Sequence, residues 1–252
     1  MLSPLGEAAL KNADTVVTAG IRMGLRDLFG KKHEDKKGFC FIICVSNEAY
    51  FSEASFYINK LKIPDGYSVE IFPVRDIPGM AAGYNTGMTS TTAKYKIYMH
   101  QDVFVLNPNF LSDILTVFSM DKKIGMIGMI GSRKLAPDAL PWHSDRVGNI
   151  YELDRDNVNF TGYSYKPDDG LTEVEAAEGF LLATCTDIAW RDDLFDGWDY
   201  YDMAQCFEFR KAGYKVVVPE QRRPWVAHDE SINNRWTFDK SRRVFMEQYM
   251  NS

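Results

Sequence analysis

The segment KYKIYMHQDVFVLNPNFL (residues 94–111) places an apolar run, Ile97–Met99, directly before the polar cluster His100-Gln101-Asp102, and a second apolar run after it. Open α/β sheets place their ligand chemistry at the C-terminal ends of buried strands, where such an acid would lie. Asp102 beside a histidine can hold a hard divalent cation and, through it, a diphosphate. An Asp that only starts a turn gives the same local pattern, so the neighbouring segments must decide between the two interpretations.

Alternating strands and helices surround this segment. Phe39–Val45 is an unbroken apolar run, typical of a central parallel strand, and Tyr67–Val74 predicts a second strand. Helical spacing of apolar residues predicts one helix after Ser46-Asn47 and another over 80–93, before a strand over 95–99. This order predicts βαβ units, and therefore an α/β fold with a Rossmann-like, mostly parallel central sheet flanked by helices.

The rest of the chain continues the pattern with one interruption. The further elements that we expect are a helix over 108–120, strands over 124–130, within 175–184 and over 214–219, and helices over 199–213 and 237–250. Residues 132–172 are rich in Asp, Pro, Asn and Gly, and we expect a long irregular insert there. We divide the chain into an N-terminal helix and charged linker (1–37), a main domain (38–236) and a C-terminal helix packed on that domain (237–252).

Composition narrows the class of protein. The chain has 252 residues, of which 45% are hydrophobic, and this suits one large α/β domain. Its net charge of −6 disfavours a nucleic-acid binder, which needs a basic surface for phosphate contacts. The four cysteines have no zinc-site spacing, and we interpret them as buried free thiols in a reducing compartment.

The N-terminal region carries no signal-peptide pattern, and the sequence contains no transmembrane run. We therefore expect a cytoplasmic protein. Leu10, Val17 and Leu28 belong to one apolar stripe at helical spacing, which predicts the N-terminal helix. Because that segment has few cations, docking on the main domain or forming a homodimer is a better interpretation than contact with a membrane surface.

Two loops that follow strands are candidates for binding a nucleotide. Val45-Ser46-Asn47-Glu48 begins a helix, where backbone amides attract anions, although a simple N-cap explains the same residues. Asp76 ends the second strand, and the small residues over 79–83 would let a ligand approach the backbone ahead of Asn85. A turn before a tightly packed helix is the alternative. The glycine spacing is not GxGxxG and no GxxxxGK[ST] occurs, which disfavours a nicotinamide dehydrogenase and a P-loop ATPase.

Two later clusters contain further candidates. Trp198-Asp199-Tyr200-Tyr201-Asp202 precedes a predicted helix, and a carboxylate near the start of a helix also stabilises its N-terminus. Val226-Ala227-His228-Asp229 follows a Pro-Trp pair, and a single histidine there is more often structural or solvated than a ligand.

In their order along the chain, these segments resemble the GT-A nucleotide-sugar glycosyltransferases of the family-2-like branch. More narrowly, they resemble a glycosyltransferase domain related to a streptomycin-biosynthesis protein. The resemblance covers about 39–228 and rests on the order and spacing of short motifs. These motifs are FCFIICVSNE (39–48), PGMAAGYNTGMTSTTAKYKIYMHQD (78–102), VEAAEGFLLAT (174–184), FDGWDYYDMAQCFEFRKAGYKVVVP (195–219) and VAH (226–228).

The resemblance implies a hexosyltransferase-type enzyme that moves a sugar from a UDP- or GDP-sugar to a hydroxyl of a glycan or another acceptor, assisted by Mn²⁺ or Mg²⁺. In-line attack would invert the anomeric centre. The implied metal ligands are Asp102, His228 and His100. The implied catalytic base is Asp202, with Glu178 and Asp199 as alternatives. The implied donor contacts are Val45, Ser46, Asn47, Glu48, Asp76, Gly79, Met80, Asn85 and Gln101. Trp142 and His143 in the insert would help to form an acceptor site or a lid.

The chain departs from the family pattern at two positions. The usual DxD motif reads His100-Gln101-Asp102, and an acid expected two residues after Asp202 is Ala204. These departures keep open a protein of the same fold that binds a nucleotide or a glycan without transferring sugar. A nucleotidyltransferase is disfavoured because its Gly-rich basic loop is missing from 46–49, and a pure interaction module is the remaining alternative.

Overall fold

The computed structural model describes residues 34–154, 157–163, 170–229 and 238–251. The predicted N-terminal helix, residues 31–33 of the predicted linker and the proposed helix-mediated dimer contact lie outside these residues. The first strand, β1, already begins at Asp35, so the last residues assigned to the linker belong to the sheet. Across the described residues, none of the helices is both long and apolar enough to span a bilayer.

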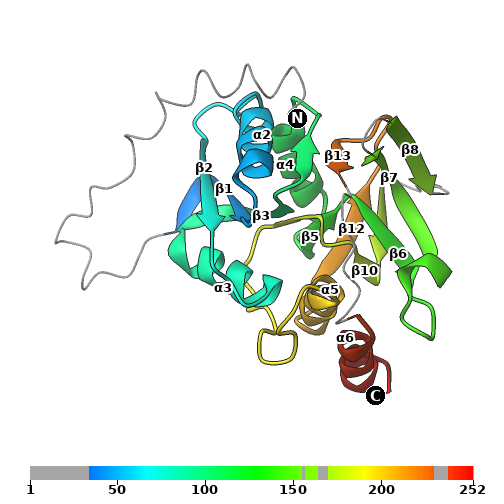
Figure 1. The fold of residues 1–252 in the computed structure, drawn as a ribbon. Coiled ribbons are helices and arrows are strands. Elements are labelled where there is room, and N and C mark those ends of the chain that lie inside the picture. Colours follow the sequence, from blue (N-terminus) through cyan, green and yellow to red (C-terminus); the bar gives the residue numbers. More distant parts are fainter. Residues whose placement is uncertain (1–33, 155–156, 164–169, 230–237, 252) are drawn as a thin grey trace.

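The central sheet has seven strands in the order β2-β1-β3-β11-β5-β12-β9 (Figure 1). Their bounds are β2 Ser68–Val74, β1 Asp35–Cys44, β3 Ala93–His100, β11 Leu181–Thr184, β5 Ile124–Gly128, β12 Lys215–Pro219 and β9 Leu171–Val174. Strand β1 pairs in parallel with β2 and β3, and β12 pairs in parallel with β5. Only β11 and β9 run against the other strands of this sheet. The predicted α/β fold with a mostly parallel central sheet is therefore confirmed.

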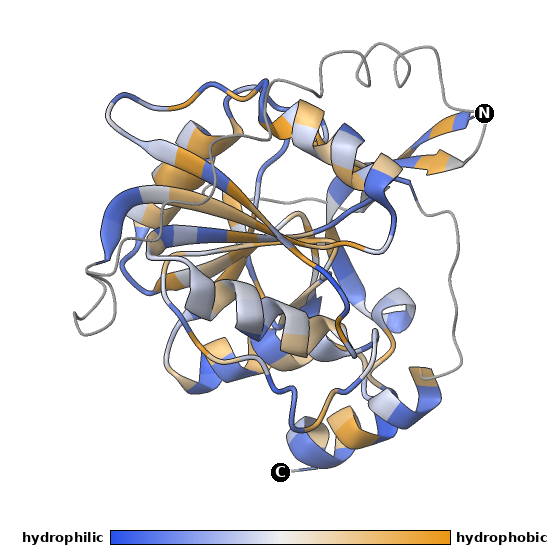
Figure 2. Cartoon of the chain, turned by 60° about the vertical axis from the view of Figure 1, so that its left-hand side comes forward, coloured by the Kyte–Doolittle hydropathy of each residue, from blue (hydrophilic) through white to orange (hydrophobic). Residues whose placement is uncertain are grey.

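Helices cover both faces of this sheet. α2 (Glu48–Ile58) and α4 (Phe110–Met120) lie on one side, and α3 (Met80–Ser90) and α5 (Tyr201–Lys211) lie on the other (Figure 1). The sheet has one hydrophobic core on each face. Successive side chains of β1 pack alternately into these two cores, because side chains of a strand point to opposite faces. Figure 2 shows this arrangement as a hydrophobic layer of strands between the helices. The predicted N-cap Asn47 accepts a hydrogen bond from the backbone of Ala49.

A second, six-stranded sheet stands beside the first, and its main path runs β10-β6-β7-β13-β4 with β8 paired to β7. Its strands are β10 Ala176–Ala177, β6 Ile130–Lys134, β7 Asp145–Asp154, β13 Val226–Asp229, β4 Val103–Val105 and β8 Asn157–Tyr163. The expectation of an irregular insert over 132–172 is wrong, because β7 and β8 lie within it and β6 extends into it. The side chains of β8 are mostly exposed, so this strand has no apolar run that would reveal it in the sequence.

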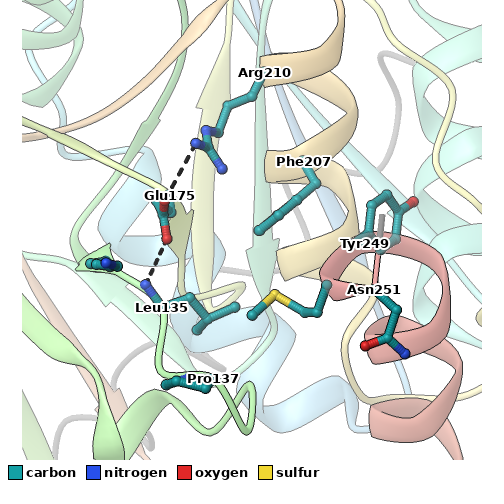
Figure 3. A pocket seen from close by; sticks show the side chains of 9 residues that line it. Leu135, Pro137, Glu175, Phe207, Arg210, Tyr249 and Asn251 are labelled. Carbon is teal, nitrogen blue, oxygen red and sulfur yellow. Dashed lines mark hydrogen bonds and ion pairs between the residues drawn. The ribbon is translucent and has the colours of Figure 1, made fainter.

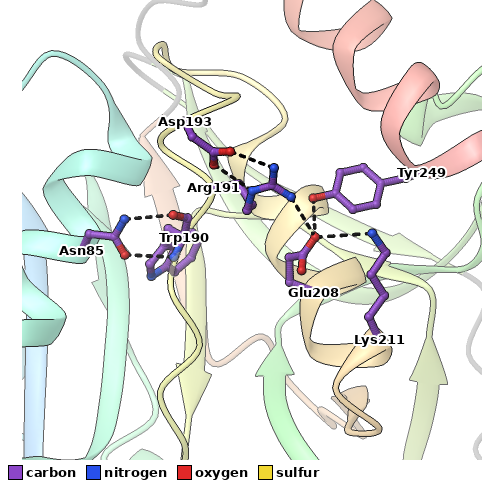
Figure 4. Close-up of polar contacts among 7 residues, drawn as sticks. All are labelled: Asn85, Trp190, Arg191, Asp193, Glu208, Lys211 and Tyr249. Atoms are coloured by element: carbon purple, nitrogen blue, oxygen red, sulfur yellow. Dashed lines mark hydrogen bonds and ion pairs between the residues drawn. The ribbon is translucent and has the colours of Figure 1, made fainter.

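The chain ends in α6 (Phe238–Phe245), which continues as a π-helical turn over Met246–Met250. Phe245 is fully buried, and its ring lies 5.4 Å from that of Tyr200 and 5.2 Å from that of Phe207. Glu208 on α5 adds a polar contact by accepting a hydrogen bond from the Tyr249 hydroxyl at 2.7 Å (Figure 4). The C-terminal segment is thereby held against helix α5.

All four cysteines are free thiols. Cys40, Cys44 and Cys206 are buried as expected, whereas Cys185 is partly exposed. Burial raises the pKa of Cys206 to about 12, so this thiol is protonated and inert at neutral pH.

Candidate metal and active site

Three chemically active side chains meet where the two sheets adjoin. His100 is the last residue of β3, and Asp102 lies between β3 and β4. His228 belongs to β13, which pairs antiparallel with β4 so that His228 faces Val103. The backbone N–H of Asp229 donates to the carbonyl of Asp102 at 2.9 Å and fixes this register. Strand pairing therefore brings together residues that are far apart in the sequence.

The geometry of this cluster suits a shared ion. Possible ligand atoms of His100, Asp102 and His228 all lie within 4.8 Å of one another. Oδ1 of Asp102 is 3.5 Å from Nε2 of His228 and 4.0 Å from Nδ1 of His100. The same Oδ1 is buried and has no hydrogen-bond partner among the described residues. A buried carboxylate oxygen without a partner is costly unless something charged satisfies it, as a cation would.

The protonation states of the cluster also suit an ion. Desolvation acts to raise the pKa of Asp102, but contact with His228 and the neighbouring imidazoles outweighs it and holds this pKa below its usual range. Desolvation lowers the pKa of His100 to about 4. At neutral pH the group is therefore a carboxylate beside a neutral imidazole, and these are the forms that ligate metals. Two imidazoles with one carboxylate are a donor set that suits first-row transition-metal dications better than an all-oxygen site would.

Gln101 connects this cluster to the loop after β1. Its Oε1 accepts hydrogen bonds from the backbone N–H groups of Ser46 and Asn47, both at 2.8 Å, and its Nε2 donates to the Ser46 hydroxyl. Val45, at the base of the loop, is buried. Glu48 is exposed and forms a two-pronged ion pair with Arg75. The predicted nucleotide loop therefore adjoins the predicted metal motif.

The second predicted nucleotide segment is largely occupied by protein contacts. Asp76 is exposed and has a left-handed backbone with φ of 55°. The expectation was that small residues here leave room for a ligand. In the structure, a Cβ at Gly79 would lie 2.6 Å from the backbone carbonyl of Asp196, and the Met80 N–H donates to the carbonyl of Gly197. The backbone at residues 196–197 occupies this space, so close packing of protein is the reason for the glycine.

Asn85 has a structural task of its own. Its side chain donates to the carbonyl of Trp190 and accepts from the N–H of the same residue, both at 2.9 Å (Figure 4). Both polar atoms of this amide, which the family resemblance implies as a donor contact, therefore bond to the backbone of Trp190.

Asp202 lies in the first turn of helix α5 (Tyr201–Lys211) and is partly buried. Its Oδ2 accepts from the Gly179 N–H at 2.7 Å and its Oδ1 from the Met203 N–H at 2.8 Å. Desolvation nevertheless raises the pKa of Asp202 to about 6, with a further contribution from the charge of Glu178. A carboxylate with a pKa near neutrality is a suitable general base.

The two alternative bases have different surroundings. Glu178 forms an ion pair with Arg146, whose guanidinium lies 3.8 Å from the centre of the Tyr163 ring. Asp199 is partly exposed on the turn before α5. An ion-paired carboxylate is a weaker base than a desolvated one, so the surroundings favour Asp202 over Glu178.

Sequence reasoning missed Tyr201, which lies between the metal cluster and Asp202. Its hydroxyl is 2.6 Å from Nε2 of His100 and 3.5 Å from the carbonyl oxygen of Gly179. Because Gly179 also donates to Asp202, the metal cluster and the candidate base share one short path of hydrogen bonds. The only signal in the sequence is the position of Tyr201 directly before the acid.

A separate hollow of about 440 Å³ lies at the far end of α5, between Glu175, Phe207, Arg210 and Tyr249 (Figure 3). Glu175 accepts from the N–H of Leu135 at 2.8 Å and pairs with Arg210 at 3.6 Å. None of the candidate site residues lines this hollow, and its Glu175 carboxylate is already bonded to Leu135 and Arg210.

Comparison with known proteins agrees with this architecture. A family model described as "Glycosyltransferase like family" matches residues 40–249. No curated protein matches the sequence.

Among solved structures, GalNAc-T7 with UDP, GalNAc and Mn²⁺ is similar at a TM-score of 0.54 and 11% identity, over 79% of this chain and 45% of that one. The mannosyltransferase PcManGT from Pyrobaculum calidifontis, in complex with GDP-Man and Mn²⁺, is similar at a TM-score of 0.53 and 11% identity. The match covers 86% of this chain and 65% of that one. TarS 1–349 from S. aureus is similar at a TM-score of 0.53 and 10% identity, over 85% of this chain and 66% of that one. The chain thus spans about half to two thirds of the length of these structures. At such identities the likeness establishes the GT-A fold.

Proposed function

This chain belongs to the glycosyltransferase-like family, and we propose that it transfers a sugar from a nucleotide-diphosphate donor to a hydroxyl group of an acceptor. The observation that carries the proposal is the buried Oδ1 of Asp102, which lies between two histidines and receives no well-formed hydrogen bond from the described residues. It lies at the C-terminal end of a central strand, which is where α/β folds bind their ligands.

Asp102, with His228 and His100, would hold the divalent cation, for which Mn²⁺ is our first candidate and Mg²⁺ our second. When bound, such an ion supplies Lewis-acid stabilisation for negative charge on a diphosphate. The loop over 45–48 would bind the donor next to this cluster, because Gln101 joins the two. Exposed Asp76 would contact the ribose or the base of a UDP- or GDP-sugar.

We assign the role of general base to Asp202. Its carboxylate would accept the proton of the acceptor hydroxyl while the acceptor oxygen forms a bond to the anomeric carbon. The bond between that carbon and the diphosphate oxygen breaks in the same step, and the diphosphate leaves with the electron pair. Attack from the side opposite the leaving group inverts the anomeric centre. Glu178 and Asp199 are the alternatives for this role.

Trp142 provides a surface for the acceptor. About half of this side chain is exposed, and one face of its ring stacks on Phe238 at 5.5 Å. Phe238 in turn packs on Tyr200, two residues before the proposed base. Aromatic rings of this kind suit the apolar faces of sugars, so a glycan acceptor of a hexosyltransferase is our proposal. His143, adjacent to Trp142, is held by Asp138 at 2.7 Å.

A second candidate function is binding of a nucleotide or glycan without transfer. Ala204, at the position where the family pattern has an acid, is fully buried. No carboxylate is therefore presented from that position of α5, and the site has one acid fewer than the family pattern.

The proposal can be tested by thermal unfolding with UDP, GDP and their sugar conjugates, in Mn²⁺, in Mg²⁺ and in EDTA. A nucleotide that binds the folded state raises the unfolding temperature. We expect stabilisation by one nucleotide that is lost in EDTA, and release of free nucleoside diphosphate when the matching sugar donor and a glycan are added. Stabilisation without release would favour the binding protein. No stabilisation by any nucleotide would contradict the transferase and favour a protein of this fold that binds a glycan.

A further inference from the structure

Tyr201 is a fully enclosed tyrosine whose hydroxyl points at a candidate metal ligand. Only 3% of the residue is exposed, and its ring packs against those of Tyr84 and Trp190 with centroids 5.9 Å and 6.0 Å away. The hydroxyl lies 2.6 Å from Nε2 of His100, which is a strong hydrogen bond. Packing on several sides leaves the hydroxyl little freedom to turn elsewhere.

The backbone of Gly179 contacts both Tyr201 and Asp202. The Tyr201 hydroxyl is 3.5 Å from the Gly179 carbonyl oxygen, and the Gly179 N–H donates to Asp202. A Cβ on residue 179 would lie 2.6 Å from both the Tyr201 hydroxyl and Cβ of Asp202. Only glycine therefore lets both side chains approach this backbone segment.

The two ring nitrogens of His100 have different surroundings. Nε2 faces Tyr201, whereas Nδ1 faces Oδ1 of Asp102 at 4.0 Å, too far for a hydrogen bond. Two atoms that each lie about 2.1 Å from one ion are at most about 4.2 Å apart, so this separation is compatible with a shared cation. A histidine that ligates through one nitrogen donates from the other, and the partner that accepts fixes its tautomer.

We propose that Tyr201 is a positioning residue that holds His100 in the tautomer with its proton on Nε2, so that the lone pair of Nδ1 faces the cation site. The proton of Nε2 is donated to the Tyr201 hydroxyl, and the Tyr201 proton is directed to the Gly179 carbonyl. This inference rests on the metal site of the proposed function. It also gives a physical reason for a histidine in place of the first acid of the DxD motif.

The test uses the full chain with Tyr201→Phe, which removes one oxygen atom and keeps the ring. We expect Mn²⁺ affinity, measured by isothermal titration calorimetry, to fall about tenfold or more, as is usual when a partner of a metal-bound histidine is lost. Tyr200→Phe is the matched control, because its hydroxyl bonds to the Ala139 carbonyl at 2.9 Å and not to the cluster. This control should bind Mn²⁺ as the wild type does.

A nitrogen-15 NMR spectrum of the wild-type histidines is a second measurement that depends on no variant. We expect His100, assigned by comparison with a His100→Gln spectrum, to carry its proton on Nε2 both without metal and with diamagnetic Zn²⁺. A proton on Nδ1 would overturn the proposal, and so would unchanged Mn²⁺ affinity in a folded Tyr201→Phe protein.

These readouts separate the positioning role from the proposed function. Weakened Mn²⁺ binding in Tyr201→Phe without any sugar transfer by the wild type would support the positioning role and contradict the enzyme. Sugar transfer by the wild type, together with unchanged Mn²⁺ affinity in Tyr201→Phe, would support the enzyme and contradict the positioning role. A wild type that binds no divalent cation would overturn the positioning role directly.

Discussion

Nε2 of His228 lies 3.5 Å from Oδ1 of Asp102 because strand β13 pairs with β4 and places His228 opposite Val103. The contact joins a residue after the third strand of the central sheet to one near the end of the chain. Phe180 supports it from the side, since its ring stacks on that of His228 at 5.5 Å.

His228→Ala should weaken Mn²⁺ binding by at least about tenfold, because one of three proposed ligands is lost. Asp102→Ala should remove metal-dependent nucleotide binding altogether, because its carboxylate is the only acidic side chain of the three. Calorimetry with Mn²⁺, with and without nucleotide, measures both effects. His143→Ala is the matched control, since this histidine is exposed and paired with Asp138 instead. Unchanged Mn²⁺ affinity in Asp102→Ala would remove this residue from the metal site.

Asp202→Asn should reduce sugar transfer by about a hundredfold or more while nucleotide affinity stays within about twofold of the wild type, since an amide cannot accept the acceptor proton. Asp196→Asn is the control, because that carboxylate is exposed and bonded to Lys240. Turnover and nucleotide affinity are measured on the same preparations. Full transfer by Asp202→Asn would show that the base is another residue, with Glu178→Gln as the next variant to assay.

The pH dependence of kcat/KM should report the same carboxylate. Desolvation raises the pKa of Asp202 to about 6, so the carboxylate form that accepts a proton dominates above that pH. Activity should therefore be constant above about pH 7 and fall tenfold per unit below about pH 6. The same raised pKa favours folding of the protonated form, so this contribution to stability is present below about pH 4 and is lost as the pH rises through about 6. A profile that stays flat down to pH 5 would exclude Asp202 as the base.

Much of the fold follows from the sequence because strands and helices leave local signals. The apolar run at Phe39–Val45 and the polar cluster after Met99 locate two strands and the edge where they end. The pairing of β13 with β4 leaves no such signal, because four residues with two apolar positions do not specify a partner. Proximity of His228 to Asp102 could be inferred from the sequence only through the family resemblance.

Glycine and asparagine residues carry little local information about their role in the fold. A glycine that admits a ligand and a glycine that admits neighbouring backbone look identical in a sequence, and Gly79 is of the second kind. Asn85 likewise bonds to a loop more than a hundred residues away, which only the tertiary fold reveals. Tyr201 could not be singled out, because its role depends on the direction of one hydroxyl group.

Phe245→Ala tests whether the C-terminal segment is an integral part of the domain. The ring is fully buried against Tyr200 and Phe207, so its removal should lower the free energy of unfolding by about 3–5 kcal/mol. Urea denaturation followed by circular dichroism measures this loss, with Met120→Ala as a control because half of that side chain is exposed. Since Tyr200 lies two residues before Asp202, transfer should also fall in the variant. A loss below about 1 kcal/mol would mean that α6 is only loosely attached and that the domain is complete without it.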